Sequence, residues 1–138
     1  MTARPERSGS GGAGSCNCGG VRYRVNGPMR EVVACHCSQC RKQSGHFYAA
    51  TDCADADFEM VSDATLKWYA ASDAAKRGFC GECGSALFWK RNNSDKISIM
   101  AGTLDDEGGV KLDRHIFCAD KGSYYDIEDG KPQFDQGD

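Results

Sequence analysis

The sequence predicts a mainly β domain, largely antiparallel, with one or two helical turns. Three observations predict this fold class: short runs that alternate apolar and polar residues, clusters of Gly, Asn and Asp between the runs, and a single segment with helical spacing. The 138 residues correspond to one domain, and a chain of this length buries about two-thirds of its unfolded surface.

The clearest predicted strand is Val21–Val25, which places three apolar side chains on one face and two arginines on the other. Similar runs predict strands at Val32–Cys37, Phe47–Thr51, Phe58–Val61, Ala86–Lys90, Ile97–Ala101, His115–Cys118 and Tyr124–Ile127. Periodicity leaves the segment Ala64–Arg77 undecided. Ala64, Trp68, Ala71 and Ala75 have helical spacing, yet Leu66 and Trp68 also alternate as in a strand.

Both ends of the chain are predicted to lie outside the folded domain. Residues 1–14 are expected to form a disordered tail, because Ser8–Ser15 contains only Ser, Gly and Ala. The domain is expected to span residues 15–132. Residues 133–138, at the end of an acidic and Gly-punctuated stretch, are expected to form a loose C-terminus.

Charge and hydropathy exclude two classes of partner. Lys and Arg number 17 against 20 for Asp and Glu, so the net charge is −3, which argues against a nucleic-acid partner. No stretch approaches the roughly 20 apolar residues of a membrane span, and no apolar segment follows the N-terminal arginines as in a signal peptide. We therefore expect no membrane partner and a cytoplasmic location.

The nine cysteines carry the most specific information. Their number is odd and no secretion signal precedes them, so metal binding or catalysis is favoured over disulfide formation. Seven of them form three clusters: Cys16 and Cys18, then Cys35, Cys37 and Cys40, then Cys80 and Cys83. Thiols two apart in an extended segment share a face, and a CxxC turn followed by Gly brings two thiols to one ion.

The simplest partition gives two zinc sites. Cys16 and Cys18 with Cys80 and Cys83 supply four thiolates, which close a tetrahedral structural site. Cys35, Cys37 and Cys40 then form a three-thiolate site with one open position. The spacing also allows other partitions, in which His36 or His46 completes the second site and makes it structural.

Three segments together resemble a known family. Cys16-Asn17-Cys18-Gly19-Gly20-Val21-Arg22-Tyr23, Cys35-His36-Cys37-Ser38-Gln39-Cys40-Arg41-Lys42 and Phe79-Cys80-Gly81-Glu82-Cys83-Gly84-Ser85 occur in the order seen in that family. The sequence resembles the glutathione-dependent formaldehyde-activating enzyme family, whose domain is shared with centromere protein V. The resemblance covers about residues 15–132, although Tyr124 stands where family members commonly carry Trp.

The resemblance implies an Mss4-like fold of several small antiparallel sheets organised around zinc, with a strand and a connecting loop over Ala64–Arg77. It also implies a structural zinc on Cys16, Cys18, Cys80 and Cys83, and a catalytic zinc on Cys35, Cys37 and Cys40. The implied reaction is that of a carbon–sulfur lyase, with glutathione as co-substrate and S-hydroxymethylglutathione as the adduct of formaldehyde.

The residues themselves suit such chemistry, since a thiolate-rich zinc accepts a further thiolate as ligand. Candidate contacts to the thiol compound are the six residues that follow the second cluster: Arg41, Lys42, Gln43, Ser44, Gly45 and His46. Arg41 and Lys42 would attract carboxylates, and His46 would carry a proton. His36 should point away from its neighbouring ligands, and Cys53 and Cys118 are expected to be small buried side chains.

Three other functions remain open at this stage. The same cysteines would serve a non-catalytic zinc scaffold or a glutathione carrier. A chromatin-associated role like that of the centromere relative is disfavoured by the negative charge and by the lack of a basic extension.

Overall fold

The computed structural model describes residues 11–105 and 109–137. In this part of the chain the strands are β1 (Gly12–Ser15), β2 (Val21–Val25), β3 (Val32–Cys35), β4 (Tyr48–Ala54), β5 (Phe58–Asp63), β6 (Leu66–Tyr69), β7 (Ala75–Cys80), β8 (Ala86–Arg91), β9 (Lys96–Met100) and β10 (Leu112–Ile116). The helical segments there are α1 (Ser38–Ser44) and the 3-10 turns η1 (Asp55–Asp57), η2 (Ala101–Thr103) and η3 (Cys118–Asp120). The prediction of a mainly β protein with little helix is confirmed.

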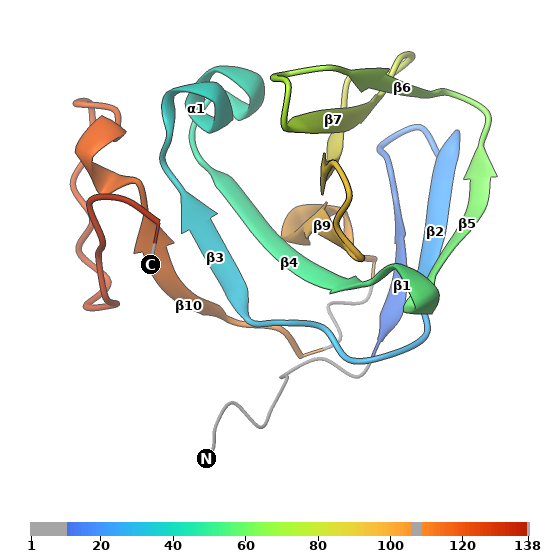
Figure 1. Ribbon diagram of the computed structural model, residues 1–138, viewed down its shortest axis with the longest axis horizontal. Helices are drawn as coiled ribbons and strands as arrows, with labels where there is room; N and C mark the ends of the chain where they lie inside the picture. The colour runs from blue at the N-terminus through green and yellow to red at the C-terminus, as the bar shows by residue number, and fades with distance from the viewer. Residues whose placement is uncertain (1–10, 106–108, 138) are drawn as a thin grey trace.

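The described strands form two sheets. One has three strands in the order β1-β2-β5, and the other has seven in the order β10-β3-β4-β9-β8-β7-β6. The pair β10–β3 is parallel, and the other strand pairs are antiparallel. The small sheet stands on one side of the molecule, with β10, β3 and α1 on the other and β4 running between them (Figure 1). The expectation of several small antiparallel sheets is wrong to this extent: one sheet is large and mixed.

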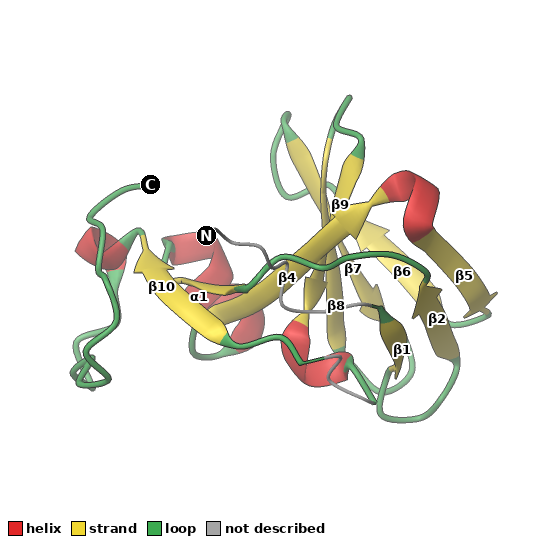
Figure 2. Cartoon of the chain, turned by 90° about the horizontal axis from the view of Figure 1, so that it is seen from below, coloured by secondary structure: helices red, strands yellow, loops and turns green. Residues whose placement is uncertain are grey.

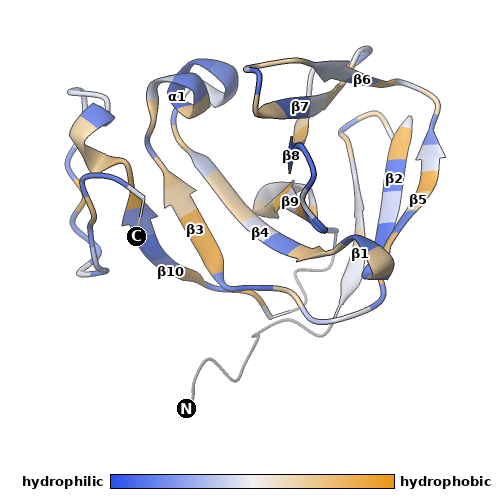
Figure 3. Cartoon of the chain, viewed as in Figure 1, coloured by the Kyte–Doolittle hydropathy of each residue, from blue (hydrophilic) through white to orange (hydrophobic). Residues whose placement is uncertain are grey.

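The main core lies between the small sheet and the middle of the large one. Tyr23 of β2 packs its ring 5.7 Å from Phe58 and 5.3 Å from Phe88, and the Tyr23 hydroxyl bonds Thr103 Oγ1 at 2.7 Å. Hydrophobic and hydrophilic residues alternate along β2, whereas β3 is hydrophobic over its visible length (Figure 3). Cys53 is fully buried in this core, as predicted, while Cys118 is half-buried.

The predicted strands are confirmed at seven of eight places: Val21–Val25 has the predicted ends, and the others are shifted at one end or both. Val32–Cys37 ends early, because Cys37 is the N-cap of α1. The strand predicted at His115–Cys118 is instead Leu112–Ile116, and it stops where Phe117 takes a left-handed conformation with φ of 55°. The strand predicted at Tyr124–Ile127 is wrong, since that segment is a turn followed by irregular chain.

The undecided segment Ala64–Arg77 contains strand β6, a connecting loop and the first residues of β7. This is the arrangement that the family resemblance implied. Trp68 stacks on Phe88, two strands away in the same sheet, with ring centroids 6.1 Å apart, so packing between strands rather than helical spacing decides the conformation.

Both predicted chain ends need correction within the described residues. Strand β1 begins at Gly12 and pairs with β2, so the boundary expected at Ser15 lies too late; residues 1–10 are outside the described part. Residues 134–136 are not loose, because their backbone groups form hydrogen bonds with His115, Phe117, Cys118 and Ala119. Figure 2 shows this segment running beside β10. Hydrogen bonds between backbone groups do not depend on side-chain type, so the sequence pattern does not reveal this pairing. In the described chain, no helix has the length and apolar character required to cross a bilayer.

Candidate metal centres

The four-cysteine cluster joins the two sheets. Cys16 and Cys18 lie in the connection from β1 to β2, Cys80 ends β7, and Cys83 lies in the turn to β8. The four sulfur atoms lie within 4.8 Å of one another. Gly19, with φ of 83°, and Gly84, with φ of 80°, take the left-handed conformation that turns the backbone away after each pair.

The sulfur spacing in this cluster fits a tetrahedral metal ion. Cys18 Sγ lies 3.7 Å from both Cys16 Sγ and Cys80 Sγ. Thiolates at about 2.3 Å from a tetrahedral zinc lie about 3.8 Å apart, whereas a disulfide requires about 2.05 Å. All nine cysteines are free thiols. The cluster is therefore able to hold a metal ion and is not a pair of disulfides.

Hydrogen bonds lower the pKa of two thiols of this cluster, whereas at Cys18 the bonds to Cys16 and Cys80 outweigh that of the Gly20 N–H and raise the pKa to about 11. The Ser85 hydroxyl lies 3.2 Å from Cys83 Sγ and lowers the pKa of the Cys83 thiol to about 5. Thr65 Oγ1, 3.1 Å from Cys80 Sγ, lowers the pKa of that thiol as well. The backbone N–H of Val21 donates to Cys16 Sγ at 3.2 Å. Such donors stabilise thiolates, the form that binds metals.

The three-cysteine cluster lies where β3 passes into α1. Cys35 ends β3, Cys37 caps the helix, and Cys40 lies buried in the first turn. The Cys40 backbone N–H donates to Cys37 Sγ at 3.3 Å, so the thiol takes the place of the usual Ser or Asp cap. The three sulfurs lie within 4.8 Å of one another, and no fourth Cys, His, Asp or Glu among the described residues joins them.

Crowding of three thiols favours a thiolate at Cys37. Hydrogen bonds first from Cys35 and then from Cys40 hold the pKa of the Cys37 thiol at about 2, and Arg77 assists. The hydrogen bonds of Cys35 with Cys37 and Cys40 raise the pKa of the Cys35 thiol far above its usual value. A second cation at this place, the metal ion, would allow all three sulfurs to be thiolates.

A cavity of about 430 Å³ opens onto the three-cysteine cluster. Its lining contains three arginines and no Asp or Glu among the described residues. The lining residues are Arg30, Val33, Cys35, Cys37, Gln39, Cys40, Tyr48, Ala50, Ser72, Ala74, Ala75, Arg77, Trp89, Arg91, Ser98, Ile116 and Phe117. A metal ion on this cluster would thus face a space with an apolar wall and a positive charge.

Sequence comparison identifies the family. The family model described as glutathione-dependent formaldehyde-activating enzyme matches residues 12–120. The chain belongs to this family. A Halomonas elongata protein named "Putative glutathione-dependent formaldehyde-activating enzyme" is 41% identical over 125 residues, which are 83% of this chain and 80% of that protein. A Schizosaccharomyces pombe protein named as an uncharacterized lyase is 25% identical over 122 residues, 88% of each chain.

A solved structure supports the same relationship. The crystal structure of a Rhodobacter sphaeroides structural-genomics protein superposes with a TM-score of 0.55 and 28% sequence identity. The match covers 72% of this chain and 98% of that one. This match adds fold similarity to the family assignment.

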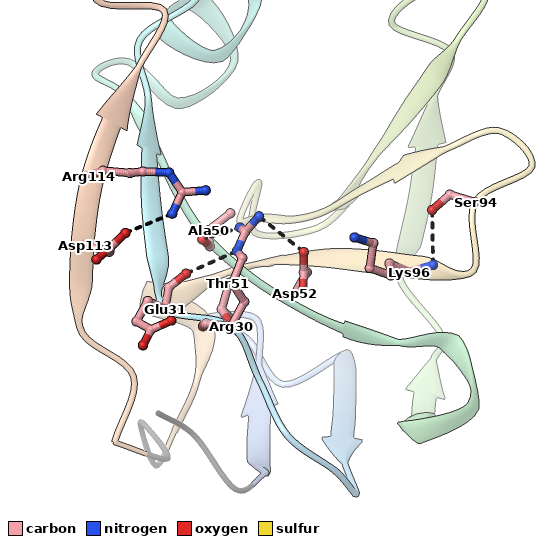
Figure 4. A network of polar contacts seen from close by, with 9 residues as sticks. All are labelled: Arg30, Glu31, Ala50, Thr51, Asp52, Ser94, Lys96, Asp113 and Arg114. Carbon is pink, nitrogen blue, oxygen red and sulfur yellow. Dashed lines mark hydrogen bonds and ion pairs between the residues drawn. The ribbon is translucent and has the colours of Figure 1, made fainter. Parts of the chain in front are cut away.

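In this member of the family, Arg30 is held firmly in the wall of the cavity. Its guanidinium pairs with Asp52 Oδ2 at 3.2 Å and donates to the carbonyl oxygens of Ala50 at 2.9 Å and Glu31 at 3.1 Å (Figure 4). These contacts hold the residues that precede β3 against β4. Arg91, by contrast, is exposed at the end of β8.

The six residues predicted to contact a thiol compound take different places. Lys42 and Gln43 line a second cavity of about 300 Å³, which shares Gln39 and Arg77 with the first. Ser44 and Gly45 instead end α1: the Ser44 hydroxyl donates to Cys40 O at 2.7 Å, and the Gly45 N–H donates to Arg41 O at 2.9 Å. None of Arg41, Ser44, Gly45 and His46 belongs to the described lining of either cavity.

His36 follows β3 directly and, unlike Cys35 and Cys37, does not line the cavity, in line with the prediction that it points away from them. It is 1% exposed, and its Nε2 lies 2.9 Å from Nδ1 of His115. His115 Nε2 donates in turn to the Asp129 carboxylate at 2.8 Å, and the Tyr125 hydroxyl bonds His36 Nδ1. Burial, assisted by His115, lowers the pKa of His36 to about 4, so the ring is neutral at pH 7.

His46 is exposed and bonds the Tyr124 hydroxyl through Nδ1. Its ring packs 4.6 Å from the ring of Tyr125, next to the buried His36 and His115. His36 and His46 therefore do not complete the three-cysteine cluster, and the partition into four and three ligands is the one that the structure assembles.

Sequence reasoning missed the residues that surround the three cysteines from other strands. Arg77 of β7, Tyr48 of β4 and Trp89 of β8 all line the cavity, and Arg77 and Trp89 lie far from the cluster in the chain. Arg77 precedes the third cysteine cluster by only three positions, but nothing in the sequence distinguishes it from a solvated arginine of a strand.

Proposed function

We propose that this chain is a zinc-dependent enzyme of the carbon–sulfur lyase type, which forms or cleaves the adduct of glutathione with formaldehyde. In this proposal, Cys16, Cys18, Cys80 and Cys83 hold a structural zinc, and Cys35, Cys37 and Cys40 hold a catalytic one. Family membership and the named relatives support the activity. The Mss4-like fold implied by the same family is part of the proposal.

The observation that carries the proposal is the unequal number of ligands. Four thiols close one cluster, whereas the second has three and opens onto a cavity. A zinc ion on three protein ligands supplies a position for an incoming thiol and lowers the pKa of that thiol.

Around that position the chain positions and shields the reactants. Val33, Ala50 and Trp89 give the cavity apolar walls, which limit the access of bulk water to the reacting sulfur. Arg91 at the rim and Lys42 in the adjoining cavity are placed to attract the carboxylates of glutathione.

The reaction balances without a further reagent. The sulfur of the thiolate adds to the carbonyl carbon of formaldehyde, a carbon–sulfur bond forms, and the electron pair of the carbonyl moves to oxygen. The proton released by the thiol returns to that oxygen through water, which gives the hydroxymethyl thioether. The reverse sequence cleaves the adduct.

Because this adduct also forms without an enzyme, the test must measure acceleration. Exchange between ¹³C-formaldehyde and S-hydroxymethylglutathione is followed by NMR with the full chain loaded with two zinc ions. We expect faster exchange with the wild type and the uncatalysed rate with Cys40→Ser. An uncatalysed rate with the fully loaded wild type would refute the enzyme, and binding of glutathione without acceleration would instead identify a carrier.

A further inference from the structure

Arg77 is a buried cation beside the three-cysteine cluster. Its side chain rises from β7 between two cavities, and the residue is only 3% exposed. A buried guanidinium is costly unless an anion or a set of acceptors compensates its charge.

The partners of Arg77 are unusual for a buried arginine. Nη2 donates to Cys40 Sγ at 3.5 Å and to Gln39 Oε1 at 3.4 Å, and the guanidinium carbon lies 4.9 Å from the centre of the Tyr48 ring. Over residues 11–105 and 109–137, no carboxylate forms an ion pair with it. Nε and Nη1 are buried and have no hydrogen-bond partner among the described residues.

The three sulfurs, as the thiolates that a bound metal ion would hold, would therefore supply the counter-charge of Arg77. Removing the cation would leave the thiolates without their nearest positive side chain.

The positive charge of Arg77 changes the net charge of the three-cysteine centre. Three thiolates and one divalent zinc carry a net charge of −1, so a fourth, anionic ligand brings the centre to −2 if nothing compensates it. With Arg77 included, these totals become 0 and −1. Charges a few ångströms apart change a binding equilibrium by about tenfold or more, even at an effective dielectric constant near 20.

We propose that Arg77 is the positioning residue that makes the three-cysteine centre accept an anionic fourth ligand, a thiolate, in preference to a neutral one. It acts through Cys40 rather than by touching the thiol compound. This inference rests on the proposed function, since it requires a metal ion with an open position on this cluster.

The test compares a thiol with a neutral ligand on the cobalt-substituted full chain. The probes are 2-mercaptoethanol, which has no carboxylate, and imidazole. Each is titrated at one pH while the sulfur-to-cobalt charge-transfer band is recorded. The four-cysteine site has no open position, so changes report on the three-cysteine site.

We expect Arg77→Met, which keeps the apolar stem, to weaken thiol binding at least about tenfold while imidazole binding stays within about threefold. Arg77→Lys should restore the preference for the thiol, because it returns the charge. Arg24→Met is the control: it removes an exposed arginine of β2 that lines neither cavity, and it should change neither affinity.

Each result decides between the two proposals. Equal weakening of both probes in Arg77→Met, or an unchanged ratio, overturns the role of Arg77 while the open site stands. A wild-type protein that binds neither probe overturns the open site itself and the proposed function with it. If circular dichroism shows that Arg77→Met is unfolded, Arg77→Lys decides: a preference within about threefold of wild type supports the proposal, and a larger loss refutes it.

Discussion

Cys18 Sγ and Cys80 Sγ lie 3.7 Å apart, although 62 positions separate the two residues in the chain. Cys18 belongs to a turn of the three-stranded sheet, and Cys80 ends a strand of the seven-stranded sheet. A metal ion between them would cross-link the two sheets at one point. The stability of the whole domain would then depend on that ion.

Cys80→Ser should therefore abolish cooperative folding. A structural zinc contributes about 10–16 kcal/mol of apparent binding free energy, as much as a whole domain's stability. Thermal unfolding monitored by circular dichroism checks this. The control is Cys118→Ser, because Cys118 is half-buried and lies outside both clusters. A melting temperature for Cys80→Ser within a few degrees of wild type would show that the cluster is not the structural anchor.

Cys37→Ser should keep the fold but lose one zinc ion. Serine is a preferred N-cap, so α1 retains its first hydrogen bond while the cluster loses a thiolate. Cys37→Ala loses the same ligand and the cap, which costs about 1 kcal/mol more. Native mass spectrometry should find one zinc in both variants, and denaturant unfolding should rank Ser above Ala. Two zinc ions in either variant would contradict the assignment of Cys37.

Gly45→Ala should destabilise the protein by about 1–2 kcal/mol, because Gly45 ends α1 with φ of 83° and an L-residue is strained there. A Cβ atom at this position meets no atom within 4 Å, so only the backbone conformation opposes it. Gly102→Ala is the matched control, since it also meets open space but has no positive φ. Chemical denaturation should show a near-neutral change for Gly102→Ala. Equal effects of the two substitutions would contradict this explanation.

His36 should make the protein less stable as the pH falls from about 6.5 towards 4. The pKa of His36 is about 4 in the folded state against 6.5 as the ordinary value, and the largest cause is burial. Between these values the unfolded chain binds the proton and the folded chain does not. The stability that neutral His36 contributes is therefore complete above pH 6.5 and is lost on acidification.

The measurement is the free energy of unfolding against pH for wild type and His36→Gln. Both proteins lose metal ions in acid, so the difference between the two curves isolates the histidine. The wild-type curve should fall more steeply across this window, by at most about 1.4 kcal/mol per pH unit. Parallel curves would show that His36 takes up its proton in the folded state as readily as in the unfolded one.

The sequence was sufficient for the cysteine clusters and for most strands, because both depend on local spacing. Cys35 and Cys37 share a face since alternate residues of an extended chain do so, and His36 faces the other way for the same reason. The alternation in Val21–Val25 likewise determined which side chains would be buried. The number of ligands in each cluster then separated a closed site from an open one.

Only the tertiary structure decided which strands are neighbours and what surrounds the open cluster. The parallel pairing of β10 with β3 brings His115 beside His36, and the fold carries Arg77 to Cys40 across 37 positions of sequence. Alternation specifies the face on which a side chain lies but not the strand opposite it. A buried arginine and a solvated one look the same in the sequence, because the difference lies in what the folded chain packs around them.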